Sequence, residues 1–297
     1  MSSIIHPTMP SKPQIAFLPV LSLLFSATLW GVLWYPLRLL AEQGLSGQWS
    51  TLIIYSAATL VGLPLLWRYR NEWQQPGLLC ALACASGWCN IAFILAVIEG
   101  NVVRVLLLFY LSPLWTVLLG RLLLGERLSS AARATLLLAM TGSLIMLWNP
   151  ALGIPWPEQR ADWLAISSGF AFALSNVLVR KLQHAPVMIK AAITWWGVVA
   201  LVVVMLLVSG EPLPEVSIGA VAAAVALGGI GIVLMTLAVV YGVTHMPVHR
   251  SAVILLFELV AGSLSSQWLT AEVVQANEWA GGTLILAAAW LAARSAK

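Results

Sequence analysis

One carboxylate stands near the midpoint of a long apolar stretch in this sequence of 297 residues. Glu258 falls inside the stretch 249–270. A helix rises about 1.5 Å per residue, so the side chain is expected close to the centre of a bilayer. A charge at that depth costs at least ~2.5–3.5 kcal/mol, and such residues usually face a cavity or a partner. Glu258 is therefore predicted to bind substrate or a proton, or else to hold a buried hydrogen-bond network together.

Small and polar side chains occupy helical faces in this stretch and in two others. Gly262 and Ser265 share a face with Glu258, which suits either a pore lining or a close helix contact. Asn90 and Asn176 each place one amide at membrane depth. An amide both donates and accepts hydrogen bonds, which suits a zwitterionic or amide-bearing solute. An interhelical hydrogen bond worth about 0.6 kcal/mol is the alternative interpretation for both asparagines.

Aromatic residues at membrane depth form a third candidate group. Trp30, Trp88 and Tyr110 lie away from the ends of their apolar stretches. Such rings can line a cavity for flat or cationic substrates, or they can simply pack against neighbouring helices. Many of the 15 Trp fall near the ends of stretches and are interpreted as anchors at the membrane interface.

Charged residues also mark the ends of two stretches. Glu126 and Glu272 stand at helix ends, where water is near, and are expected to cap or fix those ends rather than to bind substrate. Arg104 begins a stretch, and we expect its side chain to snorkel to the interface in preference to neutralising a substrate carboxylate.

Several kinds of catalytic chemistry lack their residues in this sequence. There is no GxxxxGK(S/T) phosphate loop, no HExxH pair and no acidic cluster, and Asp162 is the sole aspartate. The three cysteines, Cys80, Cys84 and Cys89, fall on one stretch and are interpreted as packing residues. The sequence therefore predicts no enzyme, no metal site and no cofactor.

The composition requires the elements that position these residues to be membrane helices. Hydrophobic residues make up 61% of the chain and charged residues 9%, against roughly 45–50% and 25% in soluble domains. Each apolar stretch is close to the ~20 residues that cross the hydrocarbon core as a helix. The predicted fold is an all-α integral membrane protein with ten transmembrane helices, at about 16–37, 51–67, 77–98, 102–124, 131–148, 162–180, 188–208, 217–241, 249–270 and 278–293.

The positive charges predict an orientation. With both termini in the cytoplasm, all of the 15 Lys and Arg except Arg38, Arg104 and Arg160 fall on the inner side. This asymmetry follows the positive-inside rule and supports the number of helices. The net charge of +4 is spread over loops at one leaflet and requires no nucleic-acid partner.

Two segments repeat each other at a constant offset of 146 residues. Residues 104–126 and 250–272 are both apolar and both bracketed by Arg and Glu. Five helices per half would make the second copy enter the membrane from the opposite side, which predicts two inverted repeats. The expected organisation is a cytoplasmic tail at 1–15, a first repeat at 16–148, a linker at 149–161 and a second repeat at 162–297.

Residues 112–128 (SPLWTVLLGRLLLGERL), together with Trp30-Gly31, resemble the EamA-type members of the drug/metabolite transporter superfamily. The resemblance implies two five-helix repeats and a secondary transporter, proton-coupled or of the exchange type. The second repeat departs from the pattern, because Glu258 and Leu259 stand at the positions that match Ser112 and Pro113.

These observations together predict a secondary active exporter of small metabolites, such as amino acids or related polar compounds. It would work by alternating access in the cell inner membrane, as a monomer or a homodimer, and Glu258 is the candidate residue for proton coupling. A polyspecific efflux pump for cationic drugs is one alternative, and a non-transporting membrane receptor or scaffold is another.

Overall fold

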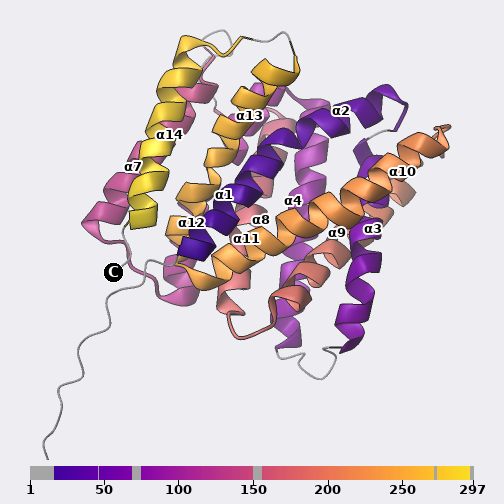
Figure 1. The fold of residues 1–297 in the computed structure, drawn as a ribbon, viewed down its shortest axis with the longest axis horizontal. Helices are drawn as coiled ribbons and strands as arrows, with labels where there is room; N and C mark the ends of the chain where they lie inside the picture. Colours follow the sequence, from indigo (N-terminus) through magenta and orange to yellow (C-terminus); the bar gives the residue numbers. More distant parts are fainter. Residues whose placement is uncertain (1–16, 46, 69–74, 150–155, 271–272, 295–297) are drawn as a thin grey trace, which may run out of the picture.

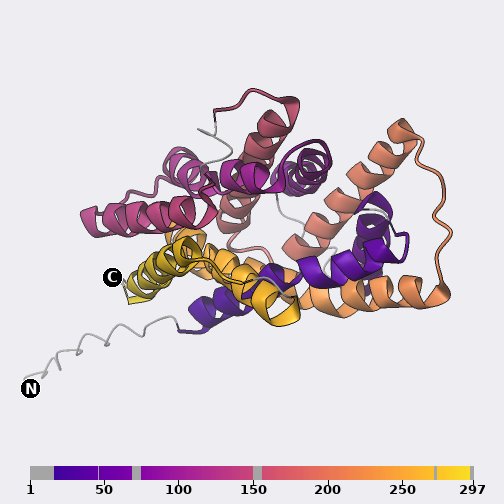
Figure 2. The same ribbon diagram turned by 90° about the horizontal axis from the view of Figure 1, so that it is seen from above.

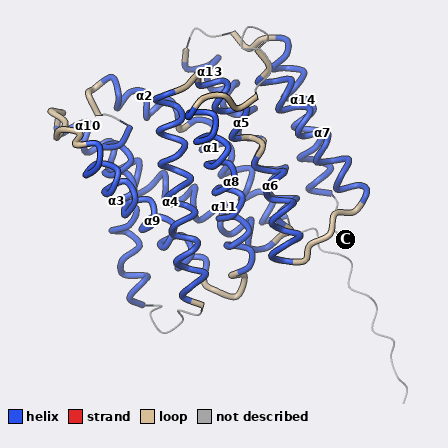
Figure 3. The backbone as a smooth tube through the Cα atoms, turned by 180° about the vertical axis from the view of Figure 1, so that it is seen from behind, coloured by secondary structure: helices blue, strands red, loops and turns tan. Residues whose placement is uncertain are grey.

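The computed structural model describes residues 17–45, 47–68, 75–149, 156–270 and 273–294. These residues form helices and loops, with no strand among them (Figure 3). The expected tail at 1–15, residues 150–155 of the expected linker and Glu272 lie outside the described residues. The predicted all-α fold is confirmed.

The helices follow the predicted apolar stretches closely. In chain order they are α1 (Phe17–Val32), α2 (Trp34–Glu42), α3 (Gly47–Arg68), α4 (Pro76–Glu99), α5 (Val102–Phe109), α6 (Ser112–Leu119), η2 (Gly120–Leu124), α7 (Ser130–Leu147), α8 (Arg160–Lys181), α9 (Val187–Ser209), α10 (Ile218–Ala226), η4 (Leu227–Ile232), α11 (Val233–His245), α12 (Val248–Leu255), α13 (Phe257–Leu269) and α14 (Ala276–Arg294).

Within the described residues, eight helical segments are long and apolar enough to cross a membrane. Consecutive elements such as α5, α6 and η2 together make one such segment. The helices α3 and α14, of 22 and 19 residues, are not among the eight. Each begins with polar residues, GQWST in α3 and ANEW in α14. The protein is thus a multi-pass membrane protein, and the count of ten helices stays a prediction.

The two repeats match in the structure at the offset found in the sequence. The helices α5 and α12 are both eight residues long, and they begin at Val102 and Val248, which are 146 residues apart. Both helices are interrupted at their ends, and hydrogen bonds from N–H(i) to O(i−3) bridge the breaks, from Leu111 to Leu108 and from Leu256 to Val253. At this offset, each repeat therefore carries a membrane span that is broken near its middle.

The two repeats are inverted relative to each other, and one helix of each repeat packs mainly against the other repeat. The helix α1 of the first repeat packs on α11 and α13 of the second, and α8 of the second repeat packs on α4, α5 and α6 of the first. Figure 1 shows α1 lying along α11 and α13, and Figure 3 shows α8 beside α4 and α6. The view in Figure 2 separates the bundle into a group that contains α7 and a group that contains α14, which meet where these two helices pack. The contact between the two groups is therefore made by residues of both repeats.

Apolar side chains are distributed as a membrane environment requires. The largest buried cluster joins residues of α1, α4, α6 to α9 and α11 to α14. A smaller cluster joins residues of α2 to α4, α9, α10, η4 and α11, and a few residues of α4, α5 and α8 form a third. Large apolar side chains such as Leu207 and Ile218 are 78% and 89% exposed. Exposure of this kind is favourable against lipid tails, whereas an equally large apolar belt on a soluble protein would be a liability.

Candidate functional site

Glu258 lies in the first turn of α13, directly after the break at Leu256. The N–H groups of a helix start are unpaired within the helix and carry partial positive charge, so this position favours a carboxylate. The residue lies deep in the bundle, yet its side chain is only half-buried. A carboxyl at this depth that keeps some accessible surface is compatible with the predicted cavity-facing position, which stays a prediction.

The carboxyl of Glu258 interacts with the hydroxyl of Tyr110. Tyr110 is the residue at which α5 ends, and it is buried. The two residues belong to different repeats, and each stands at the interruption of its own span. Helices broken at membrane depth usually line the substrate and ion sites of transporters, because unpaired backbone groups need polar surroundings. The structure therefore brings two of the predicted residues together at the contact between the repeats.

A second set of polar groups lies beside this pair. The side chain of Asn90 interacts with the hydroxyl of Tyr55 and donates to the carbonyl of Ser86 at 3.1 Å. Cys89, the residue before Asn90, lies near both Tyr55 and Glu258. We call these residues together the central polar cluster. Its members are Tyr55, Cys89, Asn90, Tyr110, Ser168 and Glu258.

Ser168 connects α8 to this cluster. Its hydroxyl donates to the carbonyl oxygen of Cys89 at 2.7 Å and lies 3.7 Å from the Cys89 sulfur. Neither Tyr55 nor Ser168 was predicted. Tyr55 carries the same signal as Tyr110, a phenol inside an apolar stretch, whereas Ser168 is one small polar residue among many.

Three of the predicted site residues lie elsewhere. Asn176 is buried in α8 and has no hydrogen-bond partner among the described residues. Trp30 is half-buried and packs against the smaller apolar cluster. Trp88 is 44% exposed, and its indole donates to Ser167 at 3.3 Å. No described interaction joins these three side chains to Glu258, so their role in a substrate site stays a prediction.

The small residues on the Glu258 face form a close helix contact with α1. The hydroxyl of Ser265 donates to the carbonyl of Gly31 at 3.3 Å, and Trp34 donates to the Ser265 hydroxyl at 2.9 Å. A Cβ atom added to Gly31 would lie 2.8 Å from the backbone nitrogen of Gly262. Of the two predicted uses for this face, the structure shows the helix contact at Gly262 and Ser265.

The charged residues at the ends of the spans form ion pairs between the repeats. Arg104 pairs with Asp162 through two bonds of 2.8 and 3.0 Å, and it also donates to the carbonyl of Trp156. The expectation that Arg104 snorkels was wrong, because a buried carboxylate of α8 lies within its reach. Asp162 also accepts from the backbone N–H groups of Glu158 and Gln159, so the start of α8 is firmly held.

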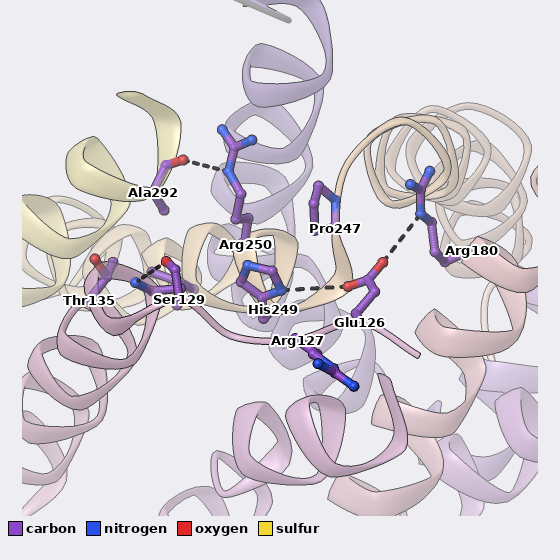
Figure 4. Close-up of a pocket in the computed structure, with 11 residues that line it drawn as sticks. Glu126, Arg127, Ser129, Thr135, Arg180, Pro247, His249, Arg250 and Ala292 are labelled. Carbon is purple, nitrogen blue, oxygen red and sulfur yellow. Dashed lines mark hydrogen bonds and ion pairs between the residues drawn. The ribbon is translucent and has the colours of Figure 1, made fainter. Parts of the chain in front are cut away.

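Glu126 lies at the opposite end of the same span and contacts the second repeat. Its neighbours border a cavity of about 370 Å³, which is also lined by residues of α7, α8, α12 and α14 (Figure 4). Glu126 accepts a hydrogen bond from the backbone N–H of Val248 at 3.0 Å. Glu126 therefore caps a helix, although the helix is α12 of the other repeat.

Among the described residues, no group of three or more His, Cys, Asp or Glu side chains is arranged to hold a metal ion. The chemistry available in the central polar cluster is therefore that of one carboxyl, two phenols, an amide, a hydroxyl and a thiol. Such groups bind protons, ammonium groups and polar solutes through hydrogen bonds and charge.

Comparisons with known proteins agree with this architecture. The model of the EamA-like transporter family matches residues 17–148 and 159–294. An uncharacterized transporter of Pseudomonas aeruginosa is 30% identical over 164 residues, which cover 52% of this chain and 51% of that protein, so the match spans about half of each. A solved crystal structure superposes with a TM-score of 0.72 at 20% identity, covering 92% of this chain and 96% of the other, and shows the same fold. The chain belongs to the EamA-like transporter family of the drug/metabolite transporter superfamily.

Proposed function

We propose that the protein is a secondary active exporter of small polar metabolites, namely amino acids and related compounds, and that Glu258 couples transport to protons or to exchange. The observation that carries this proposal is the contact between Glu258 and Tyr110 across the two repeats. A carboxyl at the junction of two moving halves can bind a ligand in one state and release it in the other.

The central polar cluster offers groups for both ends of an amino acid. The carboxylate of Glu258 would attract an ammonium group, or would take up a proton and release that group. The amide of Asn90 and the hydroxyl of Tyr55 supply hydrogen-bond donors for a carboxylate. This pairing of one acidic partner with neutral donors favours a zwitterion over a purely anionic solute.

Transport would proceed by rocking the two repeats around the cluster, so that it opens to each side in turn. With the predicted orientation, the Glu126 end faces the cytoplasm and the Arg104 end faces outward, in the inner membrane of a bacterial cell. The energy would come from an ion gradient or from substrate exchange, because the sequence carries no phosphate-binding loop.

The test is counterflow in proteoliposomes with pooled amino acids and related metabolites, with and without an imposed pH gradient. The wild type is compared with Glu258→Gln and with Glu42→Gln, a control carboxylate that is exposed and pairs with the exposed Arg38. Gradient-driven uptake that is lost in Glu258→Gln while exchange persists supports a proton-coupled exporter. Equal transport by Glu258→Gln and wild type contradicts the proposed role of Glu258.

Flux measured with a panel of cationic dyes and drugs distinguishes the metabolite exporter from the alternative, a polyspecific efflux pump. Flux of cations without flux of any zwitterion would favour that alternative, because one acidic residue among aromatic rings also suits cations. The absence of flux for every compound would instead favour a receptor or scaffold.

A further inference from the structure

Three groups of the second repeat converge on the carboxylate of Glu126. One oxygen accepts from the backbone N–H of Val248 at 3.0 Å and lies 3.5 Å from Nδ1 of His249. The other oxygen lies 3.6 Å from Nε of Arg180. Figure 4 shows the contacts of Arg180 and His249 meeting at this one side chain. Glu126 is thus a point at which the first repeat is fastened to two helices of the second.

The backbone around Gly125 directs Glu126 away from its own span. Gly125 ends η2 with φ +70°, a conformation that favours glycine, and the N–H of Glu126 returns to the carbonyl of Gly120 at 3.2 Å. The chain therefore leaves the membrane span in a sharp turn. This turn places the carboxylate of Glu126 against α12 instead of along η2.

The contact with Val248 satisfies a need of α12. This helix begins after Pro247, which supplies no side-chain cap. The first N–H groups of a helix have no partner within it, and a carboxylate near them is favourable in both hydrogen bonding and charge. The cap of α12 therefore comes from the other repeat, and separating the repeats at this end would leave the N–H of Val248 without it.

Arg180 extends the attachment into the second repeat. It also donates to the carbonyl of Thr244 at 2.5 Å, and the Thr244 hydroxyl lies 2.6 Å from Nζ of the fully buried Lys190. Lys190 further donates to the carbonyl of Leu182 at the end of α8. These hydrogen bonds connect the ends of α8, α9 and α11. Through Arg180, Glu126 is therefore attached to all three helices.

Among the described residues at this end of the molecule, few other contacts near Glu126 hold the two repeats together. The cavity of about 370 Å³ lies between the repeats here, so apolar packing does not fill this end. Three arginines line it, but Figure 4 shows Arg127, Arg180 and Arg250 pointing in different directions, and Arg250 is engaged by the carbonyls of Ala292 and Ala293. The side chains of Glu126 and Arg180 are only 18% and 24% exposed, so solvent screens their charges less than on an open surface.

We propose that Glu126 is the latch of a gate at this end of the molecule. With Glu126 bound to Val248 and Arg180, the central polar cluster is closed toward the Glu126 face, and opening to that face requires these contacts to break. The proposal rests on the alternating-access function proposed above, and it assigns Glu126 a positioning role with no contact to substrate.

Access to Cys89 from each face tests the latch. In a background with Cys80→Ser and Cys84→Ser, a membrane-impermeant methanethiosulfonate is added to right-side-out and inside-out vesicles, and the rate of Cys89 modification is measured. Glu126→Gln should raise the rate from the Glu126 face by about fivefold, the population change that ~1 kcal/mol produces, with no rise from the opposite face. Glu126→Asp keeps the charge on a shorter side chain and should give a smaller rise.

The matched control is Glu278→Gln. Glu278 also caps a helix start, accepting from the N–H of Gln275 at 2.7 Å and from Ser263 at 2.8 Å, but all three residues belong to the second repeat. Its rates should equal those of the parent from both faces. Unchanged rates in both Glu126 variants overturn the latch, and so does an equal rise from both faces, which indicates general loosening.

Substrate flux is measured separately on the same variants. A one-sided rise in Cys89 modification without flux of any compound would support the latch and contradict the transport function. Normal flux with unchanged modification rates would support the transport function and contradict the latch. The two proposals therefore fail in distinguishable ways.

Discussion

Replacement of Gly31 by alanine should separate α1 from α13 at the level of Glu258. A Cβ atom at this position would lie 2.5 Å from the carbonyl oxygen of Glu258 and 2.8 Å from the backbone nitrogen of Gly262. Both are backbone atoms, so no side-chain rotation relieves the overlap and one helix has to move. Overpacking of this kind typically costs about 1–3 kcal/mol. The turn that carries Glu258 would shift with α13, so transport should fall as well.

The measurement is thermal unfolding of purified protein in detergent, together with exchange in proteoliposomes. Gly77→Ala is the control, because Gly77 lies in α4 and a Cβ there would meet no atom within 4 Å. Alanine in a helix is favoured over glycine by up to ~1 kcal/mol, so the control should be neutral or slightly more stable. If Gly31→Ala unfolds at the wild-type temperature and exchanges substrate normally, the close contact between α1 and α13 is not as described.

Three further substitutions test other contacts. Tyr110→Phe removes the hydroxyl beside Glu258 and should reduce exchange about tenfold while leaving the unfolding temperature nearly unchanged, as judged by counterflow and a thermal scan. Asp162→Asn breaks the buried pair with Arg104 and should destabilise the protein by about 3 kcal/mol, measured by denaturant unfolding, and a wild-type midpoint would contradict this. Lys190→Met leaves the carbonyls at the end of α8 without their donor and should cost about 1–3 kcal/mol in the same assay.

The membrane spans could be predicted from the sequence because apolar length alone determines where a helix can cross a bilayer. The offset of 146 residues also transferred directly, since α5 and α12 begin at Val102 and Val248. Side-chain partners could not be predicted in the same way. Lys190 was expected at a cytoplasmic end, yet it is fully buried and donates to Thr244. Whether a charge near a helix end reaches water depends on which neighbouring helix covers it.

The same limit explains which residues of the candidate site could be predicted from the sequence. Glu258 and Tyr110 stood out because each is a polar group inside an apolar stretch, and each signal is local to one helix. The contribution of Ser168 depends on the packing of α8 against α4, since its hydroxyl donates to the carbonyl of Cys89. A serine in a membrane helix has no distinguishing local pattern, so only the arrangement of helices identifies this one.

The two broken spans differ in a way that separates geometry from chemistry. In the first repeat, Pro113 follows the break and removes a backbone donor, which favours an interruption. In the second repeat Leu259 stands at the equivalent position, yet the break at Leu256 remains, bridged by its hydrogen bond to Val253. The interruption therefore does not require the proline.

The divergence instead places a carboxyl where the first repeat has a hydroxyl. Ser112 is buried, whereas its counterpart Glu258 is half-buried and faces Tyr110. A symmetric pair of carboxylates at this depth would repel each other and double the cost of placing charge in the membrane. A single acidic residue, stabilised at the start of α13 and facing a phenol from the other repeat, avoids that cost and can still change its partner when the repeats move.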